Sequence, residues 1–105
     1  MGGRDFSLTS GVREGAVDVV IAGDLDMAAA FRLEPEIDRL IALPGIDALV
    51  LDVGGIEFVD STGLSALLAI RERATQLGIE FTLARPSEAV RRILALTGTR
   101  SALGG

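Results

Sequence analysis

The chain of 105 residues lacks cysteine, histidine and lysine, and all ten of its basic residues are arginine. Without Cys and His, it has neither the usual zinc ligands nor a thiolate, and no Ser–His or Cys–His pair can activate a nucleophile. Without Lys, Schiff-base chemistry and a Walker A phosphate loop are excluded as well. We therefore expect no metal, no cofactor and no enzyme activity, unless carboxylates alone perform catalysis.

Long apolar runs and an excess of basic charge are also absent. No apolar stretch approaches the length of a membrane span, and the first residues lack the hydrophobic core of a signal peptide. The net charge of −5 argues against a nucleic-acid backbone or an anionic membrane as the main partner, since both attract basic surfaces. We expect a soluble cytoplasmic protein with no direct nucleic-acid or membrane contact.

The residues that are present suit one small globular domain without disulfides, because 49% are hydrophobic and 24% are charged. Apolar alternation over 6–13 and 16–22, with Glu14 and Gly15 between, predicts a β-hairpin. Apolar spacing predicts helices over 28–43 and 62–77 and a shorter helix capped by Ser87. Within the first helix, Pro35 predicts a start nearer Arg32 or a kink. Strands are predicted over 46–53 and 79–84, the first parallel to a neighbour.

The rest of the chain is organised around residues 49–68. An apolar β-branched strand leads through a glycine-containing connection, Gly54 and Gly55, into an amphipathic helix. Asp60-Ser61-Thr62-Gly63 lies where the helix begins, and Ser61 is a natural N-cap for it. A helix N-terminus also stabilises an anion, so the fold would tolerate a phosphate on Ser61, which adds about −1.5 to −2 charges.

Three segments, in order and at suitable spacing, resemble one family. Leu51-Asp52-Val53 with Phe58-Val59-Asp60-Ser61-Thr62-Gly63-Leu64 is similar to the signature of STAS domains, specifically bacterial anti-sigma-factor antagonists. Upstream, Gly23-Asp24-Leu25-Asp26 resembles the family's Gly-Glu-Leu-Asp turn. Downstream, Pro86-Ser87 to Leu96-Thr97-Gly98 resembles its later helix. The resemblance covers about residues 6–98 of a single domain spanning 1–105, and it leaves 99–105 as a tail.

The resemblance implies a small α/β domain with a mixed sheet flanked by helices. STAS domains generally continue into another strand and a C-terminal helix, so we expect a form that is shortened at the C-terminus. How one face of the sheet is covered is then open, and self-association is one answer. We expect a monomer or a weak homodimer.

The resemblance also implies a function, namely that of an anti-sigma-factor antagonist working by partner switching. The unphosphorylated protein would bind an anti-sigma factor that is also a serine kinase, and so release a sigma factor for transcription. Phosphorylation of Ser61 would end the interaction, and a phosphoserine phosphatase would restore it. The residues expected to shape this site or contact the partner are Asp24, Asp26, Phe58, Asp60, Thr62, Gly63 and Leu64, with Val59 as a further apolar candidate. Gly63 would let the partner's backbone approach closely.

Three other interpretations stay open at this stage. Asp52 at a strand end resembles the acceptor aspartate of receiver domains, but those also use a lysine, and a structural role bonded to loop amides is favoured. Carboxylates at Asp24, Asp26, Asp52 and Asp60 could serve an enzyme, although no substrate pocket is indicated. The last alternative is a non-switching STAS adaptor of a transporter, a lipid-transport system or a stress-signalling complex.

Overall fold

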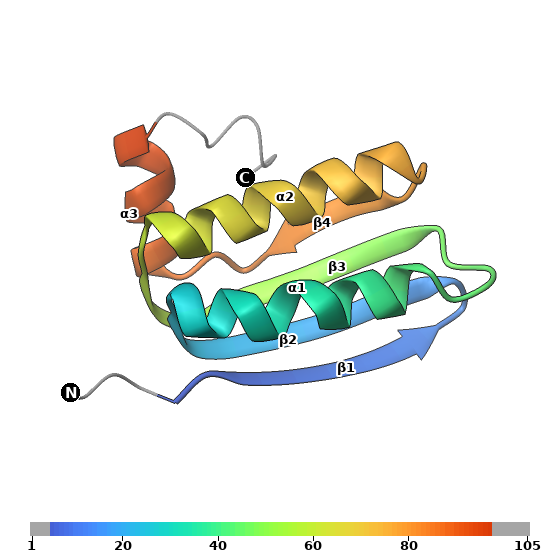
Figure 1. The fold of residues 1–105 in the computed structure, drawn as a ribbon, viewed down its shortest axis with the longest axis horizontal. Coiled ribbons are helices and arrows are strands. Elements are labelled where there is room, and N and C mark those ends of the chain that lie inside the picture. Colours follow the sequence, from blue (N-terminus) through green and yellow to red (C-terminus); the bar gives the residue numbers. More distant parts are fainter. Residues whose placement is uncertain (1–4, 98–105) are drawn as a thin grey trace.

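The computed structural model describes residues 5–97, which form a four-stranded sheet and three helices (Figure 1). In chain order the elements are β1 (Ser7–Arg13), β2 (Ala16–Leu25), α1 (Met27–Ile41), β3 (Ala48–Val59), α2 (Ser61–Gln76), β4 (Glu80–Ala84) and α3 (Glu88–Thr97). The strand order is β1-β2-β3-β4, with β1 antiparallel to β2 and the other pairs parallel. The predicted α/β fold with a mixed sheet is confirmed.

The hairpin at the N-terminal end forms where alternation and turn chemistry predicted it. Glu14 and Gly15 have φ angles of 51° and 85°, so both occupy the left-handed region that a two-residue hairpin loop of type I′ requires. The register runs without interruption from Arg13 opposite Ala16 to Ser7 opposite Ala22.

The core lies between one face of the sheet and the pair α1 and α2, which run side by side across it (Figure 1). Alternate side chains of β2 and β3 point into this layer and meet apolar stripes from both helices. The fully buried members include Val17, Val19, Ile21, Leu49, Leu51, Val53, Leu33, Ile37, Leu67 and Ile70. The opposite face is only partly buried, since Val20 is 46% exposed there. α3 packs against β3 through Val90 and Leu94.

The glycine pair that predicted a connection lies inside a strand instead. β3 continues through Gly54 and Gly55 to Val59, so the expected end of the strand at residue 53 was wrong. The register with β2 shifts twice, between Val20 and Ala22 and again between Gly23 and Asp24, because β3 carries an extra residue at each point. A Cβ on Gly55 would lie 2.8 Å from the Cβ of Ala22, which explains the glycine at the bulge.

α1 begins earlier than Pro35 suggested. The Asp26 side chain caps it, accepting a hydrogen bond of 3.0 Å from the Ala29 N–H, and the helix runs from Met27 to Ile41, so a start near Arg32 was wrong. Pro35 lies inside the helix on its exposed side, where water can satisfy the carbonyl group that loses its intrahelical partner. The predicted helix end at Gly98 and the predicted tail 99–105 lie outside the described residues.

Candidate functional site

The junction between β3 and α2 is built by an aspartate cap. Oδ1 of Asp60 accepts a hydrogen bond of 2.8 Å from the Gly63 N–H, and Asp60 has the extended backbone of an N-cap residue. The expectation that Ser61 caps the helix was wrong by one residue, because two side chains able to cap stand next to each other in the sequence. Ser61 is instead the first helical residue and is exposed. Within residues 5–97 its hydroxyl makes no hydrogen bond.

The turn that leads into α1 lies directly beside this junction. β2 and β3 remain paired to their ends, with Asp24 opposite Phe58 and Leu25 opposite Val59. The Asp60 N–H donates to the Leu25 carbonyl oxygen across a distance of 3.4 Å. The structure therefore brings Asp24, Asp26 and Ser61 to the same end of the sheet, where helices α1 and α2 both begin.

Gly63 fixes how closely α2 approaches the end of β2. It is buried, and a Cβ at this position would lie 2.1 Å from the carbonyl oxygen of Leu25 and 2.9 Å from its Cγ. The close approach that Gly63 permits is thus made by Leu25 of the same chain. This packing holds the first turn of α2, and with it Ser61, against the sheet.

The apolar residues around Ser61 divide into core and surface. Val59 and Leu64 are 8% and 6% exposed and belong to the core, Thr62 is half-buried, and Phe58 is 49% exposed. Phe58 is therefore the candidate that a partner could reach. It lines an open groove against α3, whose lining residues are Glu57, Phe58, Val59, Ala89, Arg92, Ile93 and Leu96.

Two exposed apolar side chains near the start of α1 were missed by the sequence analysis. Met27 and Phe31 are 54% and 74% exposed. Both fall outside the helical stripe formed by Ala30, Leu33 and Ile37, and that departure from the periodicity was the signal that could have identified them. Met27 directly follows the Asp26 cap and so lies at the first residue of α1.

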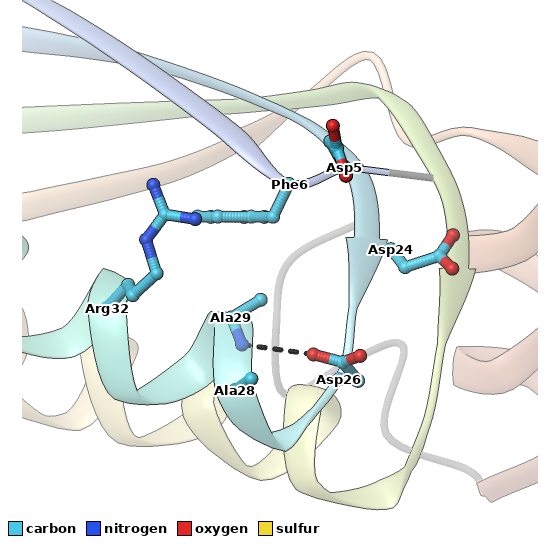
Figure 2. Close-up of a pocket in the computed structure, with 7 residues that line it drawn as sticks. All are labelled: Asp5, Phe6, Asp24, Asp26, Ala28, Ala29 and Arg32. Carbon is cyan, nitrogen blue, oxygen red and sulfur yellow. Dashed lines mark hydrogen bonds between the residues drawn. The ribbon is translucent and has the colours of Figure 1, made fainter. Parts of the chain in front are cut away.

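A shallow hollow of about 280 Å³ lies on the other side of the acidic turn, between the N-terminal residues and α1 (Figure 2). The guanidinium group of Arg32 lies over the ring of Phe6, 5.3 Å from its centroid. Figure 2 shows Asp26 engaged with the Ala29 N–H while Asp24 points toward β3. The remaining lining residues are Asp5, Ala28 and Ala29. Its small size and open shape suit a surface contact rather than an enclosed substrate.

Asp52 has the structural role that was favoured for it. Its Oδ1 accepts a hydrogen bond of 2.9 Å from the Gly54 N–H, and its Oδ2 lies 3.4 Å from Nε of Arg85. It differs from the expectation only in lying within β3 rather than at its end.

Shifted pKa values occur away from the junction between β3 and α2. Hydrogen bonding to Arg39 lowers the pKa of Glu36 on α1, and hydrogen bonding to Glu34 raises the pKa of Arg73, which joins α2 to α1. In the described part of the chain, no group of three or more carboxylates is arranged to hold a metal ion. None of the helices within residues 5–97 is both long enough and apolar enough to cross a bilayer.

Comparison with known proteins identifies the family. Residues 8–102 match the STAS domain. The chain is 30% identical over 93 residues to the anti-sigma-F factor antagonist RsfB of Mycobacterium tuberculosis, and the match covers 89% of this chain and 75% of that protein. The crystal structure of an anti-sigma factor antagonist from Mycobacterium paratuberculosis is similar with a TM-score of 0.83 and 29% identity, over 95% of this chain and 84% of that one. The fold of unphosphorylated SpoIIAA is also similar, with a TM-score of 0.74 and 22% identity over 90% and 81% of the two chains. The chain belongs to the STAS domain family.

Proposed function

We propose that this protein is an anti-sigma-factor antagonist whose partner binding is controlled by phosphorylation of Ser61. The unphosphorylated protein binds an anti-sigma factor with serine-kinase activity and so frees a sigma factor. The kinase then transfers phosphate to the Ser61 hydroxyl, the complex dissociates, and a phosphatase restores the binding form. The likeness to RsfB and to the M. paratuberculosis antagonist supports the antagonist role.

The observation that supports the switch is that α2 is capped by Asp60 and not by Ser61. Asp60 supplies the cap at 2.8 Å from the Gly63 N–H, so the exposed Ser61 hydroxyl is not needed to hold the helix. Modification of Ser61 would therefore leave the hydrogen bond that starts α2 in place. A kinase can change the surface here without having to unfold the segment.

A phosphate at this position would act on the partner more than on the fold. The helix N-terminus favours a negative charge by about 0.3–1 kcal/mol, which offsets repulsion from the neighbouring Asp60. The added charge lies three residues along the chain from Phe58, which is 49% exposed. A partner seated on this apolar surface would have to bury about two uncompensated negative charges, which is strongly unfavourable.

The test is binding of the anti-sigma factor to Ser61→Asp, measured by titration calorimetry. We expect at least tenfold weaker binding, about 1.4 kcal/mol, with thermal unfolding close to that of the wild type because an acid is well tolerated in a first helical turn.

The matched control is Gln76→Glu, which adds the same charge at the other end of α2. At about 1.5 Å per residue it lies roughly 22 Å away, beyond the screening length, and should bind like the wild type. Equal binding of Ser61→Asp and the wild type would refute the proposed switch, whereas equal weakening of both variants would indicate a general effect of charge.

A further inference from the structure

The outer edge of β1 is an open row of backbone hydrogen-bonding groups. β1 is the terminal strand of the sheet, and within residues 5–97 no strand pairs with its outer side. Every residue of β1 except Leu8, which is half-buried, is exposed. Edge strands of soluble proteins are usually protected by a bulge, a proline or an inward charge. β1 has an uninterrupted register, no proline, and one charged residue, Arg13, at its end.

The hairpin geometry determines which groups point outward. A two-residue loop is closed by a hydrogen-bonded pair, here Arg13 and Ala16. Because bonded and non-bonded pairs alternate along an antiparallel ladder, β2 uses the backbone groups of Arg13 and of every second residue before it. The outward N–H and C=O groups therefore belong to Leu8, Ser10 and Val12.

These three residues are symmetric about the middle of the strand. Ser10 is the central residue of Ser7–Arg13, so two copies of β1 that run antiparallel overlap completely when Ser10 meets Ser10. In that register Leu8 faces Val12 of the second copy, and all three pairs are of the hydrogen-bonded type. The register with the greatest overlap is thus also the one in which the outward groups match.

We infer that this edge is a self-association surface, through which two copies of the chain join β1 to β1 as one continuous antiparallel sheet. The side chains agree with this arrangement. Val12, which is 52% exposed, would pack against the partly buried Leu8 of the other copy. The Arg13 residues would lie at opposite ends of the paired strands, so that no like charges meet. β2 separates this edge from β3, so the inference does not depend on phosphorylation of Ser61.

The test is sedimentation equilibrium from micromolar to millimolar protein. The wild-type mass should rise from 10.9 kDa toward twice that value. Hydrogen exchange should slow with concentration at the amides of Leu8, Ser10 and Val12. The amides of Thr9 and Gly11, already bonded to β2, should not change.

Two variants separate the edge from other surfaces. Ser10→Pro removes the outward N–H at the symmetry axis without removing a bond to β2, and Val12→Lys places an inward charge on the edge while keeping every backbone group. Each should raise the dimer dissociation constant at least tenfold. Gln76→Lys adds the same charge on α2 and should associate like the wild type.

Val12→Lys keeps the test decisive if Ser10→Pro fails to fold. A wild-type protein that stays at 10.9 kDa up to millimolar concentration would overturn the inference. So would a dimer that forms equally well with Val12→Lys, since it would use another surface.

Discussion

Replacing Gly63 by alanine tests whether internal packing holds the junction between β3 and α2. The new Cβ would lie 2.1 Å from the Leu25 carbonyl oxygen and 2.9 Å from its Cγ. The closer of these neighbours is a backbone atom, so no rotation of a side chain can relieve that contact. The first turn of α2 and the end of β2 would have to separate by more than an ångström.

The expected cost is a net destabilisation of about 2 kcal/mol. Overpacking of a core costs about 1–3 kcal/mol, and a contact with backbone belongs to the upper part of that range. Alanine returns about 0.5–1 kcal/mol through its better helix propensity and the smaller entropy of the unfolded chain. For a domain of this size, a loss of about 2 kcal/mol lowers the melting temperature by roughly 8–16 °C.

The assay is thermal and urea unfolding followed by circular dichroism, with Gly11→Ala as the control. Gly11 lies in β1, and a Cβ there would have no neighbour within 4 Å, so that variant should match the wild type or gain about 0.5 kcal/mol. If Gly63→Ala unfolds like the wild type but loses partner binding, then Gly63 serves the partner and the packing argument fails.

Three further predictions concern single contacts. Asp60→Ala should lower the unfolding free energy by about 1 kcal/mol in urea titrations through loss of the cap; an unchanged midpoint would contradict the assigned cap. Arg73→Met should lower the free energy of unfolding by about 1 kcal/mol, because Arg73 joins α2 to Glu34 and Asp38 at 2.8 and 3.2 Å and all three side chains are partly exposed. Added salt should reduce the difference in unfolding free energy between this variant and the wild type. Arg39→Gln should raise the pKa of Glu36, now lowered by hydrogen bonding to Arg39, toward 4.5 in an NMR titration. In the wild type this pair stabilises the fold above the unfolded-state pKa of Glu36, and the contribution disappears as the pH falls through the lowered value.

Local chemistry was enough to predict much of the fold. The turn at Glu14 and Gly15 and the Ser87 cap, which accepts a hydrogen bond of 3.3 Å from the Val90 N–H, were predicted from the residues and are both present. The course of β3 through Gly54 and Gly55 could not be read in this way. Two successive glycines are typical of a connection, and only the pairing with β2, in which Gly55 lies opposite Ala22, keeps them in a bulged strand.

The junction between β3 and α2 was predicted in its location but not in its contacts. The sequence indicates a helix start at Asp60-Ser61, yet it cannot decide between adjacent residues that can both cap, because that choice depends on where the strand stops. The close approach of Gly63 to Leu25 joins residues far apart in the sequence. The exposure of Met27 and Phe31 likewise depends on which side of α1 meets α2.

Peptide-level mass spectrometry of the protein isolated from its source organism shows whether Ser61 is phosphorylated in the cell. We expect a phosphate on the peptide that contains Ser61, removed by phosphatase treatment and absent from a Ser61→Ala protein expressed in the same cells. Finding no phosphate at Ser61 under both growth and stress conditions would contradict the proposed switch.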